Sequence, residues 1–183
     1  MEIIYETKAR LQDPIHGRQK CFISGQVLFR SLAVAAAMVA TWLMATSKQS
    51  TEFFGIQIRA VYSDSPDFKF FVYANGIACV SSLVSLLTVY VLYRKGSNPS
   101  NYFYVFLHDL IIMALVMAAS VAASAIGYVG AYGNTHTGWM SICDQVDKFC
   151  HRASDSIIFS YLAFFIYLIL TVLSANESRQ IQV

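Results

Sequence analysis

The stretch from Leu110 to Tyr132 contains no charged residue, and this feature limits the possible folds more than any other. A helix needs about 20 apolar residues to cross the hydrocarbon core of a bilayer, so this stretch is long enough to span a membrane. Asp109 directly precedes it. A carboxylate at that depth is costly unless a partner compensates its charge. The sequence therefore predicts a membrane helix whose first turn carries an acid in need of a partner.

The composition also indicates a membrane protein. The chain has 183 residues, of which 56% are hydrophobic and 13% are charged, whereas soluble domains carry roughly 25% charged residues. A net charge of +2 without a basic cluster among aromatic residues is not typical of nucleic-acid binding. Because each span takes about 20 residues, four spans and short loops use most of the chain. We expect no separate soluble domain.

We predict an all-α membrane protein that forms a four-transmembrane-helix bundle. Within a membrane domain of residues 27–175, the expected spans are about 27–46, 70–93, 105–132 and 156–175. Residues 1–26 and 176–183 form tails. The first tail is mixed and charged, which does not fit a cleavable signal peptide. Polar loops join the spans, and the last of them is expected from Gly133 to Ser154.

The distribution of Lys and Arg predicts the orientation of the spans. The N-terminal segment, the 94–101 linker and the C-terminal tail carry seven such residues, and the two other loops carry five. Cytoplasmic loops carry the excess of positive charge. We therefore expect cytoplasmic N- and C-termini.

Small residues recur every four positions in the third span, at Ala119, Ala123, Gly127 and Ala131. Such ridges let helix backbones approach closely within lipid. We expect this ridge to mediate helix packing among the first three spans. The fourth span is bulky and aromatic, and we expect it to cover one side of the bundle toward lipid.

Arg30 is the candidate partner of Asp109. Each residue lies within the first turns of its helix, counted from the cytoplasm, so their depths should match at 1.5 Å per residue. This favours an intramembrane ion pair between the first and third spans. The alternative is that Arg30 extends to the lipid headgroups while Asp109 caps its helix.

Cys143 and Cys150 lie seven positions apart in the last loop. If this loop is extracellular, an oxidising compartment favours a disulfide between them. The alternative is a metal site that combines the thiols with His136 or His151, but this spacing matches no tight zinc pattern. We expect no metal site.

Catalysis has no support from motifs, and we expect neither an enzyme nor a cofactor. His108 and Asp109 are adjacent and should therefore point in different directions on a helix. An acid within a membrane is a candidate for proton or cation coupling. A small oligomeric channel or transporter that uses Asp109 is therefore the alternative function, although no inverted repeat joins the two halves.

Several short motifs together resemble the plant Casparian strip membrane protein (CASP) family, which includes the CASP-like proteins. An Arg opens the first span, Asp109 lies in the third, and the second begins with Phe70-Phe-Val-Tyr-Ala-Asn-Gly-Ile-Ala78. The last loop reads Gly133-Asn-Thr-His-Thr-Gly-Trp139, with Cys143 and Cys150 after it. The resemblance covers residues 29–174, and the last loop is most similar to group 1 of the CASP-like proteins.

The resemblance implies a multi-pass plasma-membrane protein, distantly related to the MARVEL domain. It implies a non-enzymatic scaffold or membrane-domain organiser that forms homo- and hetero-oligomers with related four-span proteins. Its expected partners are membrane lipid and cell-wall proteins, and it would guide local wall modification. The family's Arg and Asp correspond to Arg30 and Asp109. Extracellular contact candidates are Phe53, Phe54 and Trp139.

One stretch departs from the family's strip-forming members. Those members have a Leu-Pro before paired Phe residues in the first extracellular loop. Here Gln49-Ser-Thr-Glu-Phe-Phe-Gly-Ile-Gln57 keeps the paired Phe but has no Leu-Pro. The resemblance therefore predicts a CASP-like relative rather than a builder of the Casparian strip.

Overall fold

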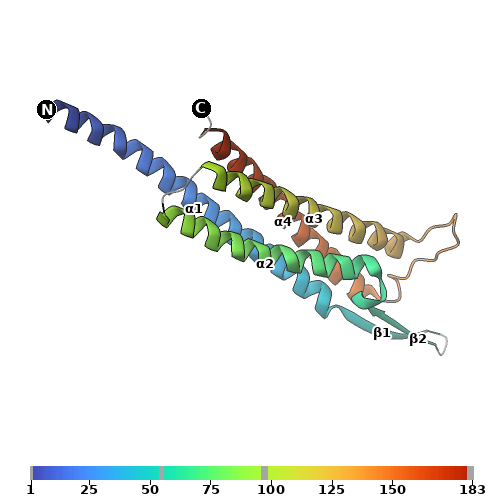
Figure 1. Ribbon diagram of the computed structural model, residues 1–183. Helices are drawn as coiled ribbons and strands as arrows, with labels where there is room; N and C mark the ends of the chain where they lie inside the picture. The colour runs from blue at the N-terminus through green and yellow to red at the C-terminus, as the bar shows by residue number, and fades with distance from the viewer. Residues whose placement is uncertain (1, 54–55, 96–98, 181–183) are drawn as a thin grey trace.

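The computed structural model is an elongated bundle of four helices with both chain termini at one end (Figure 1). It describes the backbone of residues 2–53, 56–95 and 99–180, and the side chains of residues 24–52, 57, 59–91 and 103–176. The helices are α1 (Glu2–Thr46), α2 (Pro66–Lys95), α3 (Pro99–Tyr132) and α4 (Asp147–Gln180). We refer to the end with the termini as the terminal end and to the opposite end as the loop end.

All four helices contain a segment long and apolar enough to cross a membrane. These segments are Ser24–Thr46, Pro66–Val91, Phe103–Tyr132 and Asp147–Asn176. The expected four-span, all-α membrane fold is therefore confirmed.

The fourth helix begins earlier than the sequence suggested. It starts at Asp147, so the loop before it ends at Val146 rather than at Ser154. Asp147 lies in the first turn, where a carboxylate interacts favourably with the helix dipole. Phe149 and Ala153 are buried on the inner face of the same turns. Because the exposed side of these turns carries charged residues, the sequence pattern did not reveal that they are helical and have a buried face.

The helices form a closed ring in which α1 packs on α2 and α4, and α3 packs on the same two helices. The core of this ring contains many alanines, including Ala37, Ala78 and Ala163, which are fully buried. Small side chains bring helix backbones close together, which favours dispersion contacts where lipid offers no hydrophobic driving force.

The fourth span exposes Ile158, Phe165 and Val172 on its outer face, which agrees with the expectation that it covers one side of the bundle, but its inner face is part of the core. It packs against both α1 and α3, and it buries Tyr167 and Leu170 in the main core cluster. Its aromatic residues are divided between the two environments, because Phe165 is exposed while Tyr167 is buried. A composition rich in aromatics did not reveal which of them face inward.

A β-hairpin replaces the polar loop expected after the first span. Strand β1 (Lys48–Phe53) pairs antiparallel with β2 (Ile56–Val61), from Lys48 opposite Val61 to Phe53 opposite Ile56. A short 3-10 turn, η1 (Tyr62–Asp64), leads into α2. The sequence Ile-Gln-Ile-Arg-Ala-Val alternates apolar and polar residues, which is the period of a strand. This signal was present but was hidden among charged residues.

Gly133 ends α3 in a conformation that suits glycine. Its φ is +68°, in the left-handed region, and its N–H donates to the Val129 carbonyl at 2.8 Å. The chain then folds back so that Asn134 and Trp139 exchange two backbone hydrogen bonds of 2.8 and 3.0 Å. The motif Gly133-Asn-Thr-His-Thr-Gly-Trp139 is thus a tight turn, and its backbone sets the start of the last loop.

We predict that Gly133→Ala destabilises the protein by about 1–3 kcal/mol, since a positive φ strains any residue with a Cβ. A Cβ at this position would also lie 2.6 Å from the Trp139 carbonyl oxygen. Gly138→Ala is the matched control: its φ is +73° but a Cβ there would meet nothing within 4 Å. Thermal unfolding in detergent should show a smaller loss for Gly138→Ala. Equal losses would mean that backbone strain alone, without the close approach, requires Gly133.

Candidate functional site

Arg30 of α1 and Asp109 of α3 form a two-fold hydrogen-bonded ion pair inside the bundle. The guanidinium donates from Nη1 to Oδ1 at 2.8 Å and from Nη2 to Oδ2 at 2.6 Å. The side chains are 0% and 1% exposed. Arg30 does not extend to the lipid headgroups, as the alternative proposed, because its guanidinium points into the bundle and is fully buried.

Two further side chains close a ring around the pair. Arg30 Nε donates to Gln26 Oε1 at 3.2 Å, and Gln26 Nε2 donates to Ser174 Oγ at 3.2 Å. Ser174 Oγ in turn donates to Asp109 Oδ2 at 3.1 Å. We call these four residues, Gln26, Arg30, Asp109 and Ser174, the polar ring. The ring connects α1, α3 and α4, and it satisfies both carboxylate oxygens.

Sequence reasoning missed Gln26 and Ser174. Gln26 lies one helical turn before Arg30, so the i, i+4 spacing placed the two on one face. Ser174 lies at the end of the fourth span, where a serine carries no particular signal. Its role depends on α4 packing beside the pair, which the sequence did not show.

His108 also contacts Asp109, although adjacent helix residues were expected to point apart. Its Nδ1 lies 3.4 Å from Asp109 Oδ1, and its side chain is 34% exposed. A carboxylate offers only acceptors, so this contact is favourable when Nδ1 carries the proton. Arg30 binds the same carboxylate at 2.8 and 2.6 Å, so the contact with His108 is the longer of the two.

A second set of polar contacts lies nearer the loop end and brings in α2. Ser160 Oγ of α4 donates to Asn75 Oδ1 of α2 at 3.0 Å, and it lies 2.8 Å from Ser120 Oγ of α3. Toward the terminal end, the Ser82 hydroxyl of α2 lies 2.8 Å from the Tyr167 hydroxyl of α4. Since no water competes for these groups within lipid, each bond fixes the relative register of two helices.

The predicted packing ridge on α3 is buried over part of its length. Ala119 and Ala123 are 0% exposed and belong to the second core cluster. Gly127 is half-buried, and a Cβ there would lie 3.8 Å from the Ile157 side chain of α4. Ala131 is exposed, so its assignment to helix packing is wrong for this chain's own bundle. Beyond Gly127 the last loop rather than another helix lies beside α3, since a Cβ at Gly130 would lie 3.8 Å from the Ile142 side chain.

The disulfide between Cys143 and Cys150 is present, with the two Cα atoms 5.7 Å apart. It joins the last loop to the first turn of α4 and leaves neither thiol available for a metal. The described residues contain no group of three metal-ligating side chains around it.

Strand β1 is fastened to this cross-linked segment. The Phe149 N–H donates to Gln49 Oε1 at 3.0 Å, and Thr51 Oγ1 donates to the Gln145 carbonyl at 3.1 Å. Ser47 Oγ donates to the Phe149 carbonyl at 3.4 Å. The two loops at this end are therefore one connected unit.

The predicted contact residues differ in how they are presented. Trp139 is 59% exposed, and the neighbouring Met140 is 87% exposed. Ile142 is also exposed, so the last loop presents an apolar surface. The side chains of Phe53 and Phe54 lie outside the described residues.

We predict that Asp109→Ala and Arg30→Ala each lower the folded yield, because breaking a buried pair strands a charge at about 3–5 kcal/mol. Arg30→Lys should give an intermediate yield, since lysine keeps the charge but lacks the two-fold geometry. Exchanging the two residues should restore part of the yield. Gel filtration in detergent measures the folded fraction.

Asp147→Ala is the matched control for this experiment. Its carboxylate is exposed, lies 3.3 Å from His151 and interacts with the helix dipole at the start of α4. Its removal should cost no more than about 1 kcal/mol, so the folded yield should fall far less than in Asp109→Ala. Wild-type yields for both Asp109→Ala and Arg30→Ala would show that the pair does not stabilise the bundle.

Comparison with known proteins agrees with this architecture. The Casparian strip membrane protein domain matches residues 19–166. A CASP-like protein 1F1 from Vitis vinifera is 52% identical over 94% of this chain and 84% of its own length. A CASP-like protein 1F2 from Populus trichocarpa is 48% identical over 97% of this chain and 98% of its own.

A more distant relative, a CASP-like protein 1F1 from Arabidopsis thaliana, is 36% identical over 84% of this chain and 89% of its own length. No solved structure matches the chain. The matched domain includes both members of the ion pair and the disulfide. The chain therefore belongs to the Casparian strip membrane protein family, within group 1 of its CASP-like proteins.

Proposed function

We propose that this multi-pass membrane protein is a non-enzymatic scaffold of the plasma membrane. In this role it oligomerises with copies of itself or with related four-span proteins. Both termini lie in the cytoplasm, and the loop end faces the cell wall, where it guides local modification by wall proteins. Two observations together support the proposal. The charged groups of the polar ring are buried inside the bundle, and the ordered loop end presents an exposed apolar surface.

The sealed interior supports a structural role for the intramembrane acid. Both oxygens of Asp109 accept hydrogen bonds from Arg30, and Ser174 donates a third. At 1% exposure this carboxylate is not accessible to water or to a passing cation. A channel or transporter that uses Asp109 would first have to break the pair, so the scaffold is the better-supported function.

The loop end has the features of a contact surface. The disulfide, two hydrogen bonds to β1 and one to Ser47 order it, which lowers the conformational entropy lost on binding. Trp139 projects from a turn that is held by backbone hydrogen bonds between Asn134 and Trp139 and by the Asn134 side chain, which accepts from the His136 N–H. Exposed tryptophan is among the residues that contribute most to protein interfaces.

The proposed orientation has two independent supports. The terminal end carries the excess of Lys and Arg expected of the cytoplasmic side. The disulfide is at the opposite end, and disulfides persist in oxidising compartments outside the cytoplasm.

We predict that Met140→Cys reacts with a membrane-impermeant maleimide in intact cells, because Met140 is 87% exposed at the loop end. The unsubstituted chain is the control. Its Cys79 is buried, and Cys21, in the tail predicted to be cytoplasmic, should react only after the cells are permeabilised. Labelling of Met140→Cys only after permeabilisation would reverse the proposed orientation.

We predict that differently tagged copies co-purify and that a fluorescent fusion diffuses slowly in the membrane. Trp139→Ser should weaken this association by about 30-fold or more, the effect of losing an interface residue worth 2 kcal/mol. Trp42→Ser is the matched control, since Trp42 is 70% exposed but lies on a membrane helix.

A freely diffusing monomer would contradict the scaffold. So would ion flux in reconstituted vesicles that disappears in Asp109→Asn, because that result would assign the acid to transport.

A further inference from the structure

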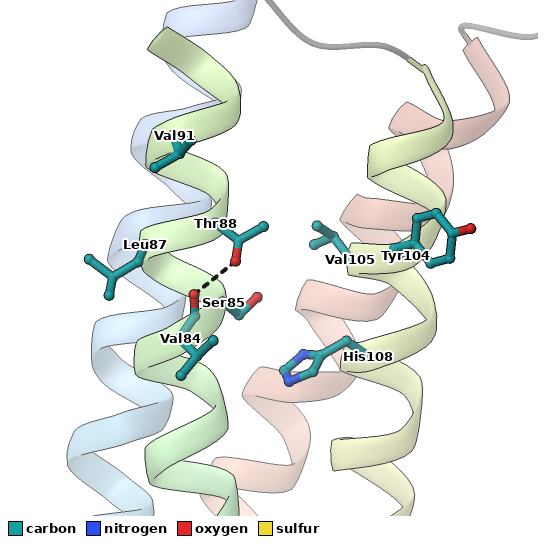
Figure 2. Close-up of a pocket in the computed structure, with 8 residues that line it drawn as sticks. All are labelled: Val84, Ser85, Leu87, Thr88, Val91, Tyr104, Val105 and His108. Carbon is teal, nitrogen blue, oxygen red and sulfur yellow. Dashed lines mark hydrogen bonds between the residues drawn. The ribbon is translucent and has the colours of Figure 1, made fainter. Parts of the chain in front are cut away.

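A groove of about 660 Å³ separates α2 from α3 in the terminal half of the bundle. Its walls are mainly apolar, and they include Leu87 and Val91 of α2 and Val105 of α3. Figure 2 shows these residues on the two facing helices. The groove lies outside the polar ring and outside the loop end, and the proposed scaffold does not use it.

Two polar groups face each other across this groove. Figure 2 shows the His108 ring projecting from α3 toward α2, with the Ser85 oxygen on the facing side of α2. Ser85 is 5% exposed as a residue and lines the groove, and its hydroxyl has no hydrogen-bond partner among the described residues. Because this hydroxyl donates to no protein group, it is available to a ligand in the groove.

The hydroxyl of Thr88 differs although it lines the same groove. It donates to the Val84 carbonyl of its own helix at 3.0 Å. Its proton is therefore not available to a ligand, whereas that of Ser85 is. This difference provides an internal control.

The two groups have complementary hydrogen-bonding roles. His108 Nδ1 lies 3.4 Å from Asp109 Oδ1, and because a carboxylate only accepts hydrogen bonds, we assign the ring proton to Nδ1. In the neutral ring Nε2 is then an acceptor. Ser85 supplies a donor from the opposite wall. The groove thus offers one acceptor and one donor on opposite sides.

The groove lies at the depth of a lipid backbone. The α3 span from Phe103 to Tyr132 has 30 residues, or about 45 Å, whereas the hydrocarbon core is about 30 Å thick. A centred span therefore passes the core by about 7 Å at each end. His108 follows Phe103 by five residues, which places it near the boundary between headgroups and hydrocarbon.

We propose that this groove binds a sphingolipid through the amide of its ceramide backbone. A trans amide directs its N–H and its C=O to opposite sides, which matches an acceptor on one wall and a donor on the other. The amide N–H donates to His108 Nε2, and the amide oxygen accepts from Ser85 Oγ. The headgroup occupies the outer part of the groove between Val91 and Tyr104. A glycerolipid backbone has ester acceptors but no donor, so it leaves His108 without a partner.

The test compares two lipids that share a headgroup. The purified full-length protein is reconstituted in phosphatidylcholine vesicles that contain either glucosylceramide or glucosyl diacylglycerol as a minor component. Lipid retained after gentle extraction is then counted by native mass spectrometry. We expect selective retention of glucosylceramide. Ser85→Ala and His108→Phe should each lower it about five-fold, the effect of one net hydrogen bond.

Thr88→Val should retain glucosylceramide as the unsubstituted protein does, because its hydroxyl already donates within α2. Leu87→Trp should block the groove by volume alone, without a change to either polar group. Equal retention of the two glycolipids would overturn the proposal. It would also be overturned by displacement of glucosylceramide by added sterol, or by a loss in Thr88→Val as large as in Ser85→Ala.

Discussion

A guanidinium and a carboxylate enclosed within a membrane bundle constrain the rest of this structure. In lipid neither charge can be compensated by water, so each requires the other at close range. Arg30 and Asp109 meet with two hydrogen bonds, and this geometry sets both the rotation and the depth of α1 relative to α3. Gln26 and Ser174 complete the arrangement and extend it to α4. The specificity of the fold thus rests on a small polar centre surrounded by alanines, which by themselves would allow many registers.

The polar ring contains no residue of α2. That helix is held instead by Asn75 and Ser82, whose partners lie on α4. The groove between α2 and α3 lies in the region where α2 has no tie to the ring. The polar contacts are therefore unevenly distributed. They join α1, α3 and α4 through the polar ring and leave a groove between α2 and α3.

The sequence predicted the parts of the structure that depend on one helix at a time. Long uncharged stretches indicated four spans, and equal depth brought Arg30 and Asp109 together as candidates. What it could not predict depends on which faces meet. Ser174 became significant only once α4 was packed inside the bundle. Ala131 continues a regular ridge, but it is exposed at the end of α3. The β-hairpin was missed because the alternating pattern of β2 is only six residues long and β1 is almost entirely polar.

The separation of Arg30 from Asp109 along the chain has a consequence for biosynthesis. The two residues are 79 positions apart, so at about 5–20 residues per second Asp109 is made roughly 4–16 s after Arg30. Ser174, which closes the ring, is made later still. During this interval the first helix holds an uncompensated cation, and β1 has no α4 on which to dock. The helices therefore cannot complete their packing one after another as they are made. The final assembly of the bundle requires the synthesis of α4.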